Sequence, residues 1–236
     1  MEPWNLLKAE TQKIGISLTQ SQVEKFEQYA VMLRQWNEKM NLTAITDPKE
    51  IVVKHFLDSL WLLHYLPIQQ QSKMIDVGTG AGFPGVPLAI TVPGLQPTLM
   101  DSLQKRLHFL QELCGVLKLP ASFVHQRAED GGQKNEFREK FDVATARAVA
   151  ALPVLCEYCM PFVKKKGMFV AWKGPDGPNE LEKSKTAIQK LGGEVHRVFT
   201  YTLCDGSSRS LIIIQKVKEC PRQYPRNAAK IKKEPL

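Results

Sequence analysis

Hydrophobic positions divide the chain into two parts with different periodicities. Over the first part they recur at helical spacing, and they predict three helices, over residues 1–14, 19–41 and 49–66. Thr19-Gln-Ser-Gln22 has the form of a capping box, which marks the start of the second helix. Pro67 and the polar run at 69–72 then predict a linker. We therefore expect residues 1–71 to form an N-terminal helical subdomain.

Short apolar runs alternate with helical patterns in the second part. Strands are predicted at 74–77, 97–101, 121–125, 141–146 and 167–172, and the helices between them begin at about 86, 103, 152 and 179. Ser102 is the expected N-cap of the second of these helices. Two adjacent strands, 195–203 and 210–217, follow and predict an antiparallel hairpin. The fold class is therefore α/β: a seven-stranded, doubly wound, mostly parallel sheet over residues 72–217, closed by an antiparallel hairpin.

A glycine-rich turn follows the first predicted strand. Residues 74–85 read Met-Ile-Asp-Val-Gly-Thr-Gly-Ala-Gly-Phe-Pro-Gly, and four of the fifteen glycines of the chain fall within eight positions. Glycine accepts positive φ angles and allows a ligand to approach the backbone. A strand, a glycine turn and a helix N-terminus at the carboxyl edge of a parallel sheet are typical of an adenosine-cofactor site. Gly78 and Gly80 are the candidate cofactor contacts within the turn.

The register of this turn helps to distinguish between cofactors. Gly80-Ala-Gly-Phe-Pro-Gly85 matches the dinucleotide fingerprint, but alone that match is weak. The strand ends at Gly78, so Phe83 occupies the position of the third fingerprint glycine. We expect Phe83 and Pro84 to crowd a pyrophosphate, and Asp76 to suit a site that attracts a cation. This register favours S-adenosylmethionine over a nicotinamide dinucleotide.

Two further positions fit either cofactor, and the end of the sheet separates the two again. Asp101 ends the second strand, where a carboxylate can accept hydrogen bonds from ribose hydroxyls. Ala128 and Glu129 follow the third strand and would flank the adenine. A closing antiparallel hairpin is unusual in dinucleotide-binding domains, which normally end in a sixth parallel strand. A nicotinamide-dependent oxidoreductase therefore remains the alternative to a methyltransferase.

Charge concentrates at the C-terminal end. The formal net charge is +8, and from Lys216 onward the chain carries seven basic and two acidic side chains. We expect residues 218–236 to form a basic tail that meets a polyanion, RNA above all, or else a solvated, disordered terminus. The five cysteines lack framework spacing, no apolar run could span a membrane, and no signal peptide is evident. We therefore expect a cytoplasmic protein with no membrane partner.

Several segments together resemble a known family, the bacterial small-subunit ribosomal RNA guanine-N7 methyltransferases (the RsmG family, formerly glucose-inhibited division protein B). The matching segments are Trp36-Asn37, Asn41-Leu-Thr-Ala-Ile45, His55-Phe-Leu-Asp-Ser-Leu60, the glycine turn from Ile75 to Ile90, Asp101-Ser102, Lys105-Arg106, Ala128-Glu129, Ala144-Thr-Ala-Arg-Ala-Val-Ala150 and Tyr224-Pro-Arg226. They cover nearly the whole chain in the expected order. The chain departs from the family pattern only in the tail, where Asn227, Ala229 and Ile231 replace a lysine, a glycine and a proline.

The resemblance implies a class I S-adenosylmethionine-dependent methyltransferase that acts on N7 of a guanine in 16S ribosomal RNA, as naked RNA or in the 30S particle. It implies cofactor contacts at Gly78, Phe83, Ala128, Glu129 and Arg147. N7 of guanine carries a lone pair and no proton, so we expect no catalytic dyad and no metal. The resemblance leaves open a non-catalytic RNA-binding ribosome assembly factor, and we expect a monomer.

Other side chains have two interpretations each. Arg147 could reach the cofactor carboxylate or an RNA phosphate, or form a surface salt bridge. Lys173 is either a phosphate contact or a solvated lysine. His55 and Asp58, three apart on a helix, could face the cleft, but we expect them to fix the helical subdomain against the main domain. Cys156-Glu-Tyr-Cys159 has redox spacing, and we expect core thiols there.

Overall fold

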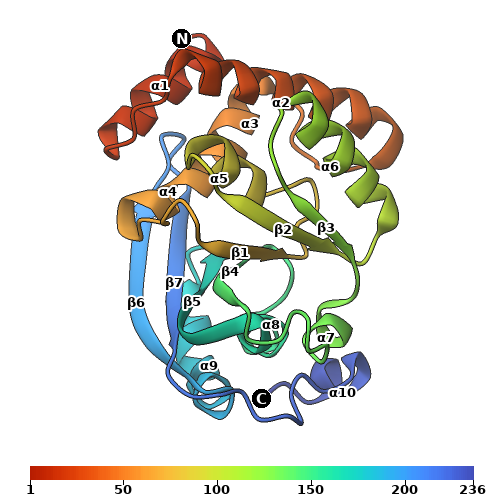
Figure 1. Ribbon diagram of the computed structural model, residues 1–236. Helices are drawn as coiled ribbons and strands as arrows, with labels where there is room; N and C mark the ends of the chain where they lie inside the picture. The colour runs from red at the N-terminus through yellow and green to blue at the C-terminus, as the bar shows by residue number, and fades with distance from the viewer.

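A seven-stranded sheet runs through the centre of the protein in the computed structural model, which describes residues 1–236 (Figure 1). Its strands lie in the order β3-β2-β1-β4-β5-β7-β6. In chain order they are β1 (Lys73–Val77), β2 (Gln96–Asp101), β3 (Ser122–His125), β4 (Phe141–Arg147), β5 (Val163–Lys173), β6 (Gly193–Thr202) and β7 (Ser208–Lys216).

The strand directions confirm the predicted sheet. β1 lies at its centre, with Ile75 opposite Thr98 of β2 and Ala144 of β4, both in parallel register. β7 runs antiparallel between β5 and β6, so the closing hairpin is also confirmed. In this order the carboxyl ends of β1, β2, β4 and β5 reach one edge of the sheet, where polar side chains from separate segments meet.

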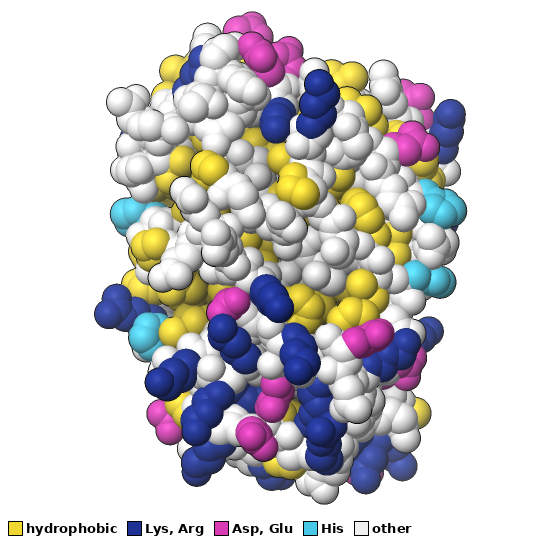
Figure 2. Space-filling model, in the orientation of Figure 1, with side chains coloured by type: hydrophobic (Ala, Val, Ile, Leu, Met, Phe, Trp, Pro, Cys, Tyr) yellow, Lys and Arg dark blue, Asp and Glu magenta, His cyan; other side chains and the backbone are white.

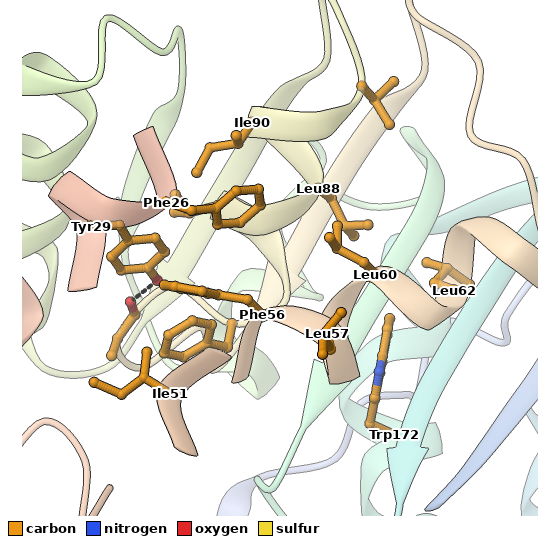
Figure 3. Close-up of a cluster of buried hydrophobic side chains, with 14 of the residues drawn as sticks. Phe26, Tyr29, Ile51, Phe56, Leu57, Leu60, Leu62, Leu88, Ile90 and Trp172 are labelled. Atoms are coloured by element: carbon orange, nitrogen blue, oxygen red, sulfur yellow. Dashed lines mark hydrogen bonds between the residues drawn. The ribbon is translucent and has the colours of Figure 1, made fainter. Parts of the chain in front are cut away.

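The N-terminal helices pack on one face of the sheet together with two helices of the second part. They are α1 (Pro3–Lys13), α2 (Gln20–Met40), α3 (Pro48–Ile51), the π-helix η1 (Val52–Leu57), α4 (Asp58–Tyr65), α5 (Gly85–Thr91) and α6 (Gln104–Val116). One continuous apolar cluster joins them to the sheet. Figure 3 shows Phe26 and Tyr29 of α2 beside Phe56 of η1 within this cluster. None of the helices is both long and apolar enough to cross a membrane.

The opposite face carries a second apolar cluster under the remaining helices. These are α7 (Ala128–Gly131), α8 (Leu152–Cys159), the 3-10 helix η2 (Met160–Phe162), α9 (Gly177–Lys190) and α10 (Ala228–Lys233). Cys156 and Cys159 belong to this cluster, and both side chains are fully buried. Burial raises the pKa of each thiol. The prediction of core thiols is confirmed.

Helix starts show where local sequence signals were sufficient. The capping box of α2 forms as predicted, because the Thr19 hydroxyl accepts a hydrogen bond from the N–H of Gln22 and the Gln22 side chain accepts one from the N–H of Thr19. The predicted cap at Ser102 is wrong. α6 begins at Gln104, and the Asp101 carboxylate accepts from the N–H of Leu103 in place of a Ser102 cap.

The C-terminal tail is ordered and packs against the second face. Arg138 donates hydrogen bonds to the carbonyls of Gly132, Cys220, Pro221 and Tyr224. Arg226 forms a bidentate pair with the buried carboxylate of Glu157, 2.6 and 2.8 Å between the nitrogen and oxygen atoms. The alternative of a disordered terminus is therefore wrong, and part of the tail's positive charge is used inside the protein.

Candidate functional site

The glycine turn begins where β1 ends, and a buried carboxylate holds its shape. Asp76 is fully buried and accepts hydrogen bonds from the Thr79 hydroxyl, the Gly85 N–H and the Thr145 hydroxyl. Burial raises the pKa of Asp76, and these hydrogen bonds oppose that rise. Asp76 therefore ties both ends of the turn to β4. The expectation that Asp76 attracts a cationic ligand is wrong, because its oxygens face the turn itself.

Conformation explains the glycines at three positions in the turn. Gly78, Gly80 and Gly82 have φ angles of 68°, 60° and 100°, a region that other residues rarely adopt. Space is also limiting at Gly78, where a Cβ atom would lie 2.7 Å from Cγ2 of Val149. The bare backbone at Gly78 is thus required both by the turn and by the side chain above it.

A cavity of about 360 Å³ opens above this turn, and we call it the glycine-turn pocket. It lies at the carboxyl ends of β1, β2 and β3. Its lining comprises Val77, Gly78, Met100, Asp101, Ser102, Gln126, Arg127, Ala128, Glu129, Val149, Ala150, Val154, Tyr158 and Lys232.

The polar groups of the glycine-turn pocket suit an adenosine. Asp101 and Glu129 are buried carboxylates, and Asp101 also accepts from the N–H of Gly80 at 2.9 Å. The Oε1 atom of Gln126 is buried without a hydrogen-bond partner, so it is free to accept one from an amino group of a ligand. Arg127 and Lys232 also line the pocket and balance the two carboxylates, which therefore act as hydrogen-bond acceptors for ribose hydroxyls or amino groups. The residues present therefore fit S-adenosylmethionine.

A second cavity of about 430 Å³ lies beside the first, at the carboxyl ends of β4 and β5, and we call it the strand-end pocket. Its lining carries four cations and two carboxylates in addition to a histidine. The residues are Ile45, Lys54, His55, Asp58, Arg147, Ala148, Trp172, Lys173, Gly174, Glu180 and Arg209.

Arg147 connects β4 to the N-terminal helices across the strand-end pocket. Its guanidinium donates to the carbonyl of Lys54 at 3.1 Å and to Oδ2 of Asp58 at 2.9 Å, and it lies 3.2 Å from Nδ1 of His55. It also lies over the ring of Phe83, 4.9 Å from the ring centre. The side chain is 12% exposed, so Arg147 is no surface salt bridge.

Asp58 receives hydrogen bonds from three strands. Besides Arg147 of β4, Tyr201 of β6 donates its hydroxyl to Oδ1 at 2.7 Å, and Trp172 of β5 donates its indole N–H to the backbone carbonyl at 2.9 Å. The prediction that His55 and Asp58 fix the helices against the main domain is confirmed. Both residues also line the strand-end pocket, so the two interpretations of this pair coexist.

Sequence reasoning missed the π-helical geometry that presents His55. The segment Val52–Leu57 is π-helical, a rare local form that often occurs at functional sites. The His55 ring stacks on Phe83 with ring centres 4.4 Å apart, and its Nε2 lies 2.9 Å from the Thr43 hydroxyl. Burial, and then the positive charge of Arg147, lower the pKa of His55 to about 3. His55 is therefore neutral at physiological pH.

The segment Ala148–Ala151 separates the two pockets. Ala148 lines the strand-end pocket, while Val149 and Ala150 line the glycine-turn pocket. An ion pair holds this segment, because Lys173 donates to the carbonyl of Ala150 at 2.8 Å and pairs with Glu180 at 2.7 Å. Lys173 is 9% exposed, so the interpretation as a solvated lysine is wrong.

The predicted cofactor residues fall into two groups. Those that line the glycine-turn pocket are Gly78, Asp101, Ala128 and Glu129. Gly80 contributes through its hydrogen bond to Asp101. Phe83 and Arg147 lie together on the side of the N-terminal helices, and neither lines that pocket. The steric argument from Phe83 against a pyrophosphate is thus wrong, because its ring packs against Tyr29 and His55.

Gln126, Val149 and Lys232 also line the glycine-turn pocket, although no pattern in the sequence assigns them to a cofactor site. Lys232 comes from α10, far along the chain from the others, and only the folded tail brings it to the pocket. No group of His, Cys, Asp and Glu side chains is placed to hold a metal ion.

Comparison with known proteins shows the family to which the chain belongs. Residues 22–212 match the family model described as GidB, rRNA small subunit methyltransferase G. The chain belongs to this family. Curated relatives with that name include proteins from Alkaliphilus oremlandii, 48% identical over the full length of both chains, and from Bacillus subtilis, 46% identical over 94% of both.

Solved structures support the fold at much lower identity. A S-adenosylmethionine-dependent O-methyltransferase from Thermotoga maritima superposes with a TM-score of 0.53 at 15% identity, covering 79% of this chain and 72% of its own. The fold is therefore that of the class I methyltransferases, as predicted. As a family member the protein is an rRNA methyltransferase with S-adenosylmethionine as its methyl donor, and the oxidoreductase alternative is wrong.

Proposed function

We propose that the protein transfers the methyl group of S-adenosylmethionine to N7 of a guanine in small-subunit ribosomal RNA. The glycine-turn pocket holds the cofactor and the strand-end pocket receives the acceptor base. One observation carries this assignment: the two pockets lie side by side on one edge of the sheet, with only the segment Ala148–Ala151 between them. Direct methyl transfer requires the cofactor and the acceptor base to bind in adjacent sites.

The residues of the two pockets have a limited chemical task. When bound, S-adenosylmethionine supplies an electrophilic methyl group on a positively charged sulfur. N7 of guanine carries a free lone pair, so no side chain has to remove a proton. Asp101 and Gln126 would orient the adenosine, and the apolar side chains of Val149 and Trp172 would limit water at the boundary between the pockets. Positioning of this kind lowers the activation barrier by several kcal/mol.

Methyl transfer can be measured directly. Small ribosomal subunits and naked small-subunit RNA, both from cells that lack the protein, are incubated with tritiated S-adenosylmethionine and the purified enzyme. Borohydride reduction and aniline cleavage then locate any N7-methylguanine. We expect label in one of the two substrates and cleavage at a guanine. Tight RNA binding without transfer to either substrate would favour a non-catalytic assembly factor and contradict the proposal.

The face that carries the tail would bind the RNA. Figure 2 shows Lys and Arg side chains gathered over the half of the molecule where α7 and α10 lie in Figure 1. The exposed basic residues of the tail are Lys218, Arg222, Lys230, Lys232 and Lys233. S-adenosylmethionine carries net positive charge, so Lys232 at the rim of its pocket suits a polyanion instead. We propose that RNA phosphates contact this side.

Charge removal on α10 tests that surface. The variant replaces Lys230, Lys232 and Lys233 with Gln, which leaves the buried anchor Ile231 in place. Each lost phosphate contact lowers the slope of log affinity against log salt by roughly 0.7 for single-stranded RNA. A matched control replaces three exposed lysines of the N-terminal helices, Lys8, Lys39 and Lys49. Equal slopes in filter binding for both triple variants would contradict the proposed RNA surface.

The chain also has a proposed division of labour. Residues 1–71 would act as a helical support for the glycine turn, 72–217 as the methyltransferase domain and 218–236 as the RNA-binding tail. We also propose a cytoplasmic monomer. Sedimentation of the purified protein, and fractionation of cells that express it, test these two statements.

A further inference from the structure

The ion pair of Lys173 and Glu180 presents an unused donor and an unused acceptor to the strand-end pocket. The ammonium of Lys173 has three protons, of which one is donated to the Ala150 carbonyl, and it forms an ion pair with Oε2 of Glu180 at 2.7 Å. Oε2 of Glu180 also accepts from the N–H of Leu152 at 2.8 Å. Oε1 of Glu180 makes no hydrogen bond. The pair can therefore donate one hydrogen bond and accept one at neighbouring points.

We propose that Lys173 and Glu180 select guanine by reading its O6 and N1–H. This inference rests on the proposed function, which places a guanine in this pocket. On guanine an acceptor, O6, stands next to a donor, N1–H, and this order matches Lys173 beside Glu180. Adenine has the opposite order, with its N6 amino group donating and N1 accepting. Adenine would therefore set two donors against each other at Lys173 and two acceptors at Glu180.

The other carboxylate of the strand-end pocket, Asp58, is already committed. Both oxygens of Asp58 are engaged, Oδ1 by the Tyr201 hydroxyl and Oδ2 by Arg147. Among the carboxylates that line the pocket, only Glu180 retains a free oxygen. Lys173 also contacts Ala150, which lines the glycine-turn pocket. Since N7 neighbours O6 on the guanine ring, an O6 held by Lys173 would keep N7 beside the boundary with the cofactor.

The variant Glu180→Gln changes this pattern without changing the size of the side chain. Oε2 accepts from the N–H of Leu152 and faces the Lys173 ammonium, and both favour an oxygen there, so the amide oxygen would take that position. The amide NH₂ would then point into the pocket where Oε1 was. The variant therefore offers a donor where guanine also has one, and it should lose the preference for guanine.

The experiment uses small-subunit RNA assembled by ligation with guanine or 2-aminopurine at the methylated position. 2-Aminopurine keeps N7 and the 2-amino group but lacks O6 and N1–H. We expect the wild-type protein to prefer guanine by roughly 5- to 150-fold in kcat/KM, the range for a bidentate base contact. Glu180→Gln should bring this ratio close to one. The matched control, Glu182→Gln, alters a carboxylate of the same helix that pairs with Lys185 at the surface, and should keep the wild-type ratio.

Each outcome separates this inference from the proposed function. A Glu180→Gln protein that keeps the wild-type preference would overturn the inference while the proposed function stands. A wild-type protein that methylates 2-aminopurine as well as guanine would overturn it without any variant, so the test does not depend on whether Glu180→Gln folds. No transfer by the wild type to guanine RNA would instead overturn the proposed function. Affinity for S-adenosylhomocysteine, measured alongside, reports whether the variant still binds cofactor.

Discussion

A half-buried histidine should make the stability of this protein depend on pH. The His55 ring packs on Phe83 and lies 3.2 Å from the guanidinium of Arg147, and its pKa is lowered from the ordinary 6.5 to about 3. The unfolded chain therefore takes up a proton at His55 well before the folded protein does. The contribution of neutral His55 to the free energy of unfolding is fully present above the unfolded pKa, and it is lost as the pH falls from 6.5 toward 3.

The size of the effect follows from these two pKa values. Each pKa unit corresponds to 1.36 kcal/mol. Integrated from about pH 7.5 to about pH 5, the difference in proton uptake removes about 2 kcal/mol of the free energy of unfolding. The variant His55→Asn removes the titrating ring and keeps a side-chain oxygen that can accept from Arg147. Its unfolding free energy should therefore fall about 2 kcal/mol less than that of the wild type over the same interval.

Urea denaturation of both proteins at the two pH values measures this difference, and the comparison cancels the titration of all other groups. His108→Asn serves as the control, because His108 is exposed on α6 and is solvated in both states. It should change the unfolding free energy equally at both pH values. A pH-dependent difference below about 0.5 kcal/mol for His55→Asn would show that His55 takes up protons alike in both states, which contradicts the argument from burial and Arg147.

Two further predictions concern the glycine turn. Gly78→Ala should lower the unfolding free energy by about 1–2 kcal/mol because the residue has a positive φ. Its new Cβ would also meet Val149, so binding of S-adenosylhomocysteine should weaken. Gly206→Ala, where φ is 84° and the space is open, should lower the unfolding free energy similarly and leave the affinity for the cofactor unchanged in calorimetry. Tyr29→Phe removes the buried hydroxyl that donates to the Ala81 carbonyl (Figure 3). It should lower the unfolding free energy measured by urea denaturation by about 1–3 kcal/mol. An unchanged unfolding free energy would contradict a supporting role for this hydrogen bond.

Local patterns in the sequence were sufficient for the strands and most helices, though not for η1, α7 or α10, and for the part of the glycine-turn pocket that comes from consecutive strand ends. Alternating apolar runs and helical spacing predicted the seven strands and which of them run parallel or antiparallel, because each element has to bury one face. Gly78, Asp101, Ala128 and Glu129 each follow a strand, and parallel strands bring their carboxyl ends to one edge. The meeting of these four residues at the glycine-turn pocket could therefore be predicted from their positions in the sequence alone.

Contacts between distant segments could not be predicted in this way. The sequence does not show that Asp76 turns inward to hold the turn, that Phe83 packs against Tyr29, or that Lys232 returns to the glycine-turn pocket. Such contacts depend on the angle at which helices and tail pack on the sheet, and no spacing along the chain encodes that angle.

The sequence by itself thus determined which strands run parallel and which antiparallel, the glycine turn and, through the closing hairpin and the family resemblance, the cofactor and the reaction. Only the tertiary structure decided that the cleft is two pockets, that Arg147 is held by His55 and Asp58, and that Lys173 faces Glu180. The physical reason is that a backbone turn is specified by its own residues, whereas the partner of a charged side chain depends on which segments the folded core brings within hydrogen-bonding distance.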